Sequence, residues 1–180
     1  TIFLFTSCLN NEKEKKEIIF GIVIHGGAGT LLKENMSDDG QVVNLRDKFL
    51  GLRGVMELAG NSELATVKEL VLPGNQCADE GAEALANSPH LGNLEMLNLN
   101  HNDIGDDGAI AIANSEKLPK LKSLSMFGNV VGDEGAKAFA DSPQSKKYLK
   151  LDLYKNQITN DGNKFLTESE MLKNCEELEV

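Results

Sequence analysis

The chain of 180 residues is 41% apolar and 26% charged, so it is long enough to bury a core and too apolar to be disordered throughout. Its net charge of −10 argues against nonspecific binding to nucleic acid or to an anionic membrane surface, because both require a basic face. The three cysteines, Cys8, Cys77 and Cys175, are far apart and form no CxxC pair, which predicts neither a disulfide framework nor a zinc site.

Residues 1–17 join an apolar run to a polar tract. The run ends at Cys8, and residues rich in Asn, Lys and Glu follow it. This order resembles the end of a bacterial lipoprotein signal, in which cleavage before the cysteine leaves it free to carry lipid. The resemblance implies a lipid anchor at Cys8 and a protein that is secreted or held in the bacterial cell envelope. The alternative is a frayed apolar end on a cytoplasmic protein.

A β-branched run at residues 18–24 leads directly into the glycine-rich sequence His25-Gly-Gly-Ala-Gly29-Thr30. The pattern predicts a buried strand that opens into a turn, because glycine permits positive φ and close approach of the backbone. A phosphate loop would need Gly-Lys-Ser/Thr downstream, and a dinucleotide fingerprint would need glycine in place of Leu32. An α/β-hydrolase would need Gly-x-Ser-x-Gly, and the sequence contains none of these three motifs.

Residues 18–39 do resemble the first strand and turn of the isoaspartyl peptidase and L-asparaginase family. That family consists of hydrolases whose catalytic threonine is exposed by internal cleavage, well downstream of this motif. The only Gly-Thr pair in this chain is Gly29-Thr30, inside the opening motif itself, so no residue matches the nucleophile and we expect no catalytic residue. We interpret residues 18–40 as an asparaginase-like strand, turn and linker before a domain boundary near residue 40. The alternative function is a fragment or fusion of a secreted hydrolase of that family that lacks the catalytic Thr region.

From residue 41 the sequence repeats at an interval of 27 residues. Four asparagines at this interval each follow a Leu-x-Leu-x-x frame or a close relative of it: Asn75, Asn102, Asn129 and Asn156. After each asparagine, residues rich in Asp, Glu, Gly and Ala predict a short, N-capped helix, and serine closes it. These helices are expected over residues 78–86, 105–113, 132–140 and 159–167.

The two ends of the repeating region are atypical. Residues 41–66 form a degenerate first repeat in which Lys48 replaces the asparagine and a helix is expected over residues 54–59. Residues 172–180 supply a truncated last strand. An atypical terminal repeat is what a solenoid needs to seal its core from water.

This region resembles the ribonuclease-inhibitor-like class of leucine-rich repeats. The resemblance over residues 41–180 implies a right-handed α/β solenoid of strand-turn-helix repeats, with a parallel sheet on the concave face. It also implies a non-catalytic protein-protein interaction module without a cofactor, because that class mainly supplies binding surfaces for other proteins.

The recurring polar residues have a structural interpretation. We expect the stacked asparagines to form a ladder of hydrogen bonds to unpaired backbone groups, with binding of a metal or a polar ligand as the alternative. The acidic pairs at the helix starts suit helix N-termini, and their spacing does not match a calcium-binding EF-hand loop. Cys77 and Cys175 fall in apolar columns and are expected to be buried thiols.

Side chains that alternate with the core leucines are expected to point outward on the concave sheet. Phe127 and Tyr154 occupy the same column in adjacent repeats, and exposed aromatic residues on a rigid sheet are typical anchors of protein interfaces. We therefore expect a protein partner, and no nucleic acid, to bind at Met96, Asn98, Asn100, His101, Phe127, Asp152, Tyr154 and Lys155.

Overall fold

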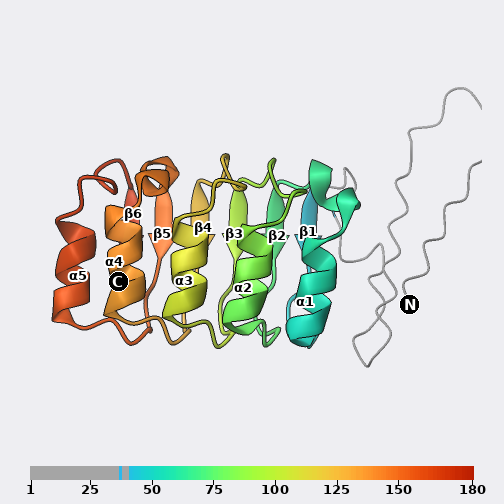
Figure 1. Ribbon diagram of the computed structural model, residues 1–180, viewed down its shortest axis with the longest axis horizontal. Helices are drawn as coiled ribbons and strands as arrows, with labels where there is room; N and C mark the ends of the chain where they lie inside the picture. Colours follow the sequence, from blue (N-terminus) through green and yellow to red (C-terminus); the bar gives the residue numbers. More distant parts are fainter. Residues whose placement is uncertain (1–36, 38–40) are drawn as a thin grey trace, which may run out of the picture.

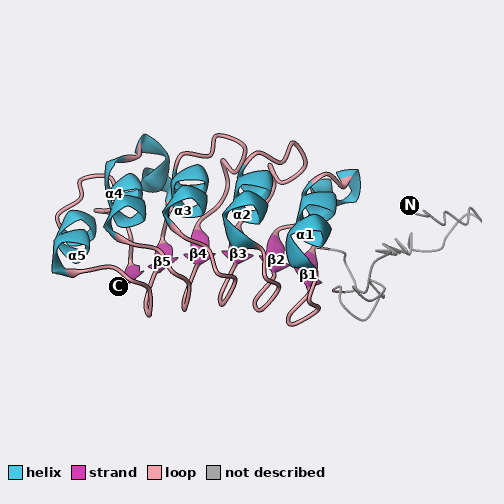
Figure 2. Cartoon of the chain, turned by 60° about the horizontal axis from the view of Figure 1, so that its bottom comes forward, coloured by secondary structure: helices cyan, strands magenta, loops and turns pink. Residues whose placement is uncertain are grey.

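The computed structural model describes residue 37 and residues 41–180. In this part of the chain, six parallel strands form one sheet in sequence order, β1-β2-β3-β4-β5-β6. The helices form a second layer on one face of that sheet (Figures 1 and 2). The predicted α/β solenoid of leucine-rich repeats is confirmed.

The strands are β1 (Val42–Asn44), β2 (Glu69–Val71), β3 (Met96–Asn98), β4 (Ser123–Ser125), β5 (Lys150–Asp152) and β6 (Glu177–Glu179). The helices are α1 (Gly51–Ala59), α2 (Ala78–Ala86), α3 (Asp106–Ala113), α4 (Asp133–Asp141) and α5 (Asn160–Thr167), with short 3-10 helices η2 (Ser62–Thr66) and η3 (Pro143–Lys147). No helix among these residues is long and apolar enough to cross a membrane.

The register of the sheet follows the sequence period. Leu97 pairs with Leu70 on one side and with Leu124 on the other, so equivalent residues of neighbouring repeats lie side by side. The degenerate first repeat joins in the same register, because Val43 pairs with Leu70. At the other end, Leu178 of β6 pairs with Leu151 of β5.

The core lies between the sheet and the helices. The inward residue of each of the central strands β2 to β5 is a buried leucine, and α2, α3 and α4 contribute the buried side chains of Leu85, Ile112 and Phe139. The fourth repeat differs from the others because Ser145 and Tyr148 stand where the third repeat has Leu118 and Leu121. Tyr148 packs edge-on against Phe139, with 6.0 Å between ring centroids.

The starts of α3 and α4 are capped by the preceding repeat, which differs from the sequence prediction, whereas the Thr159 side chain caps α5 within its own repeat, as predicted. No side chain caps the helix N-terminus within α2, α3 or α4 themselves. Instead, Asp79 Oδ1 accepts hydrogen bonds from the backbone N–H groups of Gly105 and Gly108, at 2.6 and 3.0 Å. A Cβ atom on Gly108 would lie 2.7 Å from the same oxygen, so the close approach of the carboxylate requires glycine there.

The helix ends are also tied to the preceding repeat. Serine hydroxyls donate hydrogen bonds to a carbonyl at the C-terminal end of the helix before: Ser88 to Ala59, Ser115 to Ala86, Ser142 to Ala113 and Ser169 to Ala140. Each serine therefore follows the helix of its own repeat and caps the C-terminal end of the helix in the preceding repeat.

Three smaller predictions need correction. Cys175 packs against the core but is only partly buried, whereas Cys77 is fully buried as expected. Pro73, in the outward column that also holds Phe127 and Tyr154, is buried. The first helix begins at Gly51, three residues before the start at Gly54 that the sequence pattern indicated.

Candidate protein-binding surface on the sheet face

The four asparagines lie where the chain leaves β2, β3, β4 and β5, and their amide groups form hydrogen bonds with the backbone. Asn102 Oδ1 accepts hydrogen bonds from the N–H groups of Asn75 and Cys77 at 2.9 and 3.3 Å. Its Nδ2 donates to the carbonyls of Leu72 and Asn100 at 2.9 and 3.1 Å. Asn75 and Asn129 are arranged in the same way and are buried, so these amides have no free group for a ligand.

Three of the expected binding residues also serve the turns. Asn98 Oδ1 accepts a hydrogen bond from the N–H of Asn100 at 3.1 Å, and Asp152 Oδ1 accepts one from Tyr154 at 3.0 Å. The hydroxyl group of Ser125 lies between Asn100 Oδ1 and Asp152 Oδ2, at 2.7 and 2.8 Å. These side chains stabilise the turns on which the neighbouring aromatic residues are placed.

The other residues come together at the turn end of β3, β4 and β5, in a group called here the aromatic cluster: His101, Phe127, Tyr154 and Lys155. The Phe127 ring lies at its centre, 5.2 Å from the His101 ring in an edge-to-face arrangement and 6.0 Å from the Tyr154 ring. The ammonium group of Lys155 lies 5.1 Å from the centroid of the Phe127 ring, within reach of a cation–π interaction. Tyr154 is 49% exposed, while Phe127 is half-buried.

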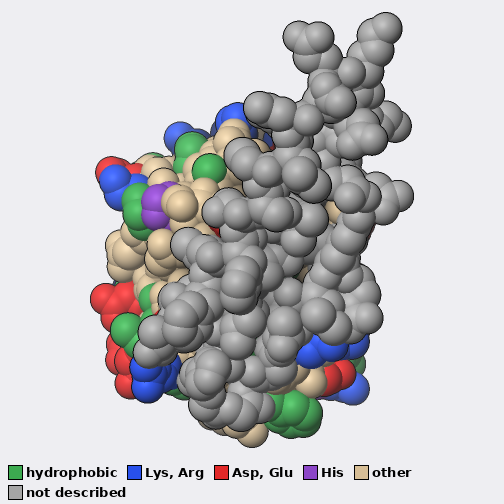
Figure 3. Space-filling view, turned by 90° about the vertical axis from the view of Figure 1, so that its right-hand side faces the viewer, with side chains coloured by type: hydrophobic (Ala, Val, Ile, Leu, Met, Phe, Trp, Pro, Cys, Tyr) green, Lys and Arg blue, Asp and Glu red, His purple; other side chains and the backbone are tan. Residues whose placement is uncertain are grey.

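Gly128 makes room for this arrangement. It adopts φ of +70°, and a Cβ atom there would lie 2.5 Å from the His101 ring. The absence of a side chain at Gly128 therefore lets His101 lean over from the preceding repeat toward Phe127. In the end-on view of Figure 3, histidine atoms lie beside hydrophobic ones on the visible part of the surface.

Met96 lies apart from the aromatic cluster. It is half-buried at the start of β3, in register with Glu69 and Ser123, and so belongs to the opposite end of the strands. Of the eight expected binding residues, the structure thus brings four together, uses three in the turns and leaves Met96 at a distance along its strand.

The sequence analysis did not identify two other exposed apolar residues. Phe49 and Val130 are 67% and 43% exposed, and each directly follows the position of the recurring asparagine. They could have been found by comparing the positions directly after the recurring asparagine, which are 27 residues apart. These positions hold Phe49, Gln76, Asp103, Val130 and Gln157.

The structure also limits the chemistry available in residues 41–180. No group of three or more His, Cys, Asp or Glu side chains in this part of the chain could hold a metal ion. Burial and the neighbouring Asp79 carboxylate raise the pKa of the Cys77 thiol to about 12, so that thiol is not a nucleophile at neutral pH.

Several sequence predictions lie outside the described residues. Lipidation of Cys8, the asparaginase-like segment and the boundary near residue 40 fall in residues 1–36 and 38–40, and they stay predictions.

Comparisons with known proteins agree with this architecture. Residues 63–86, 90–113 and 117–140 match the family model described as Leucine Rich repeat. The chain matches none of the curated proteins with which it was compared. Among solved structures it is similar to one titled "Leiomodin-1 Actin-Binding Site 2 (ABS2)", with a TM-score of 0.55 and 17% identity over 76% of this chain and 80% of that chain. At this level of identity the likeness shows a shared fold.

Proposed function

We propose that this chain is a non-catalytic protein-interaction module of the ribonuclease-inhibitor-like class, which binds a protein partner through the concave face of its sheet. The observation that carries this proposal is the aromatic cluster. Tyr154 presents about half of its surface, and Phe127 is held between the His101 ring and the Lys155 ammonium. Aromatic side chains that are exposed yet fixed in position are typical centres of binding energy at interfaces.

The rigidity of the turns supports the same proposal. Because Asp152 and Asn100 hold the backbone of Tyr154 and Phe127, at 3.0 and 2.9 Å, the two rings are placed before a partner arrives. Pre-organised contact residues lose less conformational entropy on binding. The polar residues of the sheet face thus contribute indirectly, by positioning the aromatic anchors.

The structural neighbour's title names actin as what that protein binds. We carry over no partner from it, because the likeness is one of fold at 17% identity.

The test replaces both anchors and measures capture of partners. The double variant Phe127→Ala/Tyr154→Ala should lose the partner that immobilised wild-type protein captures, with Kd raised at least tenfold, or about 1.4 kcal/mol. Met56→Ala is the matched control, because Met56 is 50% exposed on α1, on the helical layer. Capture that is unchanged by the double variant, or lost equally with Met56→Ala, would show that the sheet face is not the interface.

A further inference from the structure

One side chain of the aromatic cluster covers a neighbouring ring. The ammonium group of Lys155 lies over the Phe127 ring, 5.1 Å from its centroid. The His101 ring meets the same ring edge-on at 5.2 Å, and the Tyr154 ring is tilted beside it at 6.0 Å. With these three neighbours Phe127 is half-buried, although it lies on the outward side of the sheet. Part of the apolar surface that a partner would contact is thus already occupied.

Of these three neighbours, Lys155 is the one whose side chain is free to move away. Its ammonium group makes no hydrogen bond or ion pair with any other described residue. The backbone N–H of Tyr154 is held by Asp152 at 3.0 Å, and the backbone N–H of His101 donates to the Phe127 carbonyl at 3.0 Å. A lysine stem is long and flexible, and a cation–π contact at an exposed site is weak. Lys155 can therefore leave the ring without disturbing the turn that carries it.

Lys155 also has a backbone conformation that favours glycine. Its φ is +57°, and the equivalent positions of the second and fourth repeats hold Gly74 and Gly128, both at φ of +70°. Glycine at position 155 would adopt this conformation more easily, because it has no Cβ atom. The local backbone therefore does not account for the lysine, and what its side chain adds is the contact with the Phe127 ring.

The direction of the Lys155 side chain differs from that of its equivalents. Asp47 and His101 lean forward over the glycine of the next repeat, because a Cβ atom on Gly74 would meet Asp47 and one on Gly128 would meet His101. Lys155 instead reaches back over a ring of the preceding repeat. Phe127 is thus contacted from both neighbouring repeats, by His101 on one side and by Lys155 on the other.

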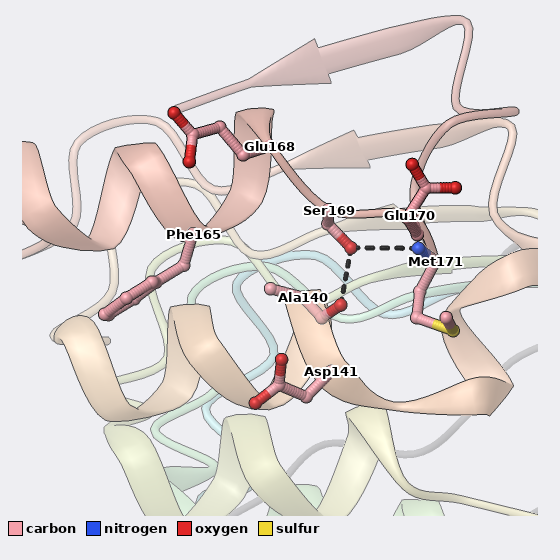
Figure 4. A pocket seen from close by; sticks show the side chains of 7 residues that line it. All are labelled: Ala140, Asp141, Phe165, Glu168, Ser169, Glu170 and Met171. Carbon is pink, nitrogen blue, oxygen red and sulfur yellow. Dashed lines mark hydrogen bonds between the residues drawn. The ribbon is translucent and has the colours of Figure 1, made fainter.

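An exposed aromatic residue on the helical layer lacks such a cover. Phe165 of α5 is 41% exposed and lines a pocket of about 320 Å³ near the C-terminal ends of α4 and α5. The residues that line this pocket include no lysine or arginine (Figure 4). Among the described residues, a lysine ammonium lies over an aromatic ring only at Phe127 and at the buried Tyr148. The covered exposed ring is therefore specific to the sheet face.

We infer that Lys155 is a movable cover on the aromatic cluster, which a partner displaces to reach the Phe127 ring. This inference rests on the proposed function, because it concerns the regulation of the same surface. On binding, the ammonium group moves into water and an apolar side chain of the partner takes its place over the ring. The His101 contact and the hydrogen bond from Phe127 to Asn100 keep the ring in position. The apparent affinity is then reduced by the fraction of chains in which the ring is covered.

The first measurement tests whether the cover exists, by NMR on the full isotope-labelled chain. If Lys155 lies over Phe127, the ring current shifts the Hε resonances of Lys155 upfield of those of Lys146, which is exposed in η3. Phe127→Leu removes the aromatic ring and should remove this upfield shift.

The second measurement tests whether removal of the lysine exposes the ring. Lys155→Gly restores the residue of the second and fourth repeats and should fold with an equal or higher Tm. A neutral nitroxide cosolute should then relax the Phe127 ring protons about two- to fivefold more strongly, as expected for loss of a weak cation–π contact. The Phe165 ring is the internal control, and its relaxation should be unchanged.

Two further variants separate the side chain from the backbone. Lys155→Asn keeps a residue that tolerates positive φ, with a side chain too short to cover the ring, so it should expose the ring as Lys155→Gly does. Lys146→Asn removes an exposed lysine elsewhere and should leave the ring unchanged.

Binding is measured with N-acetyl-leucine amide, an uncharged probe that stands for an apolar side chain of a partner. The amide resonances of Phe127 and Gly128 should shift in a saturable way. The affinity should be about two- to fivefold higher for Lys155→Gly than for the wild type, because the probe no longer competes with the lysine.

Each of four results would overturn the inference: no upfield shift at Lys155, equal relaxation of the Phe127 ring in the wild type and in Lys155→Gly, no saturable binding of the probe to Lys155→Gly, or probe binding that Lys155→Gly leaves unchanged or weakens. Weakened binding would make Lys155 a contact residue instead of a cover. The ring-current and relaxation measurements need no partner. Their failure is therefore distinct from failure of the capture assay with Phe127→Ala/Tyr154→Ala, which tests the proposed function.

Discussion

Asp106 Oδ1 lies 2.7 Å from the backbone nitrogen of Gly132, which belongs to the next repeat. The same oxygen accepts a hydrogen bond from Gly135 at 2.9 Å, so one carboxylate caps the start of α4 from outside that helix. Equivalent contacts join Asp79 to Gly105 and Asp133 to Thr159. Each interface between these repeats therefore depends on an aspartate that belongs to the repeat before it.

This contact predicts a difference between two adjacent acids. Asp106→Ala should lower the free energy of unfolding by about 1 to 3 kcal/mol, because two N–H groups at the start of α4 lose their acceptor. Asp107→Ala removes an exposed carboxylate without such a role and should change stability by less than about 0.5 kcal/mol. Urea unfolding followed by circular dichroism measures both. Equal effects would show that the acids act only through the helix dipole.

The asparagine ladder predicts a larger loss. Asn102→Ala leaves the buried N–H groups of Asn75 and Cys77 without their acceptor, so we expect a loss of about 2 to 4 kcal/mol. Asn114→Ala is the control, because it removes an exposed hydrogen bond to Ile110 at a helix end. Its cost should stay below about 1 kcal/mol. A mild effect of Asn102→Ala in the same urea experiment would contradict the structural role of the ladder.

The fourth repeat offers a test of core packing. The Tyr148 hydroxyl is buried with no hydrogen-bond partner, so Tyr148→Phe should leave the stability equal or raise it by up to about 1 kcal/mol. Tyr148→Leu should destabilise by about 2 kcal/mol or more, since Ser145 is too small to fill the remaining space.

Adding Ser145→Leu to Tyr148→Leu restores the pair found in the third repeat, Leu118 and Leu121. The second substitution should recover much of the loss, and a double-mutant cycle by thermal unfolding measures this coupling. Additive effects of the two substitutions would mean that their volumes do not compensate each other.

The Cys77 thiol predicts a reactivity and a pH dependence. Burial and the Asp79 carboxylate raise its pKa from 9.0 to about 12, so the folded state keeps the proton that the unfolded state releases. The stabilising contribution is complete below pH 9.0 and is lost as the pH rises toward about 12. At pH 8, iodoacetamide should label Cys77 only in denaturant and the partly exposed Cys175 faster in the native state, as read by peptide mass mapping. Equal native labelling of the two would contradict the burial of Cys77.

More of the fold than of the binding surface could be predicted from the sequence, and the reason is physical. Stacked repeats place equivalent residues in contact, so Leu70, Leu97 and Leu124 had to share a column once the period was known. Hydrogen bonds between repeats depend on the stagger of one turn over the next, which the period alone does not give. Asp79 therefore caps the helix of the following repeat, and the Asp152 carboxylate accepts a hydrogen bond in a turn. The sequence pattern alone would predict only that both acids are exposed.

The most direct test of the central claim, that a protein partner binds at the aromatic cluster, is site-specific photo-crosslinking. A photoreactive phenylalanine analogue at Tyr154, 49% exposed, should form a covalent product with the partner, and excess wild-type chain should suppress that product. Excess Phe127→Ala/Tyr154→Ala should not suppress it. The same analogue at Met56, 50% exposed on the helical layer, should give no such product. A partner that crosslinks from Met56 and not from Tyr154 would contradict the account.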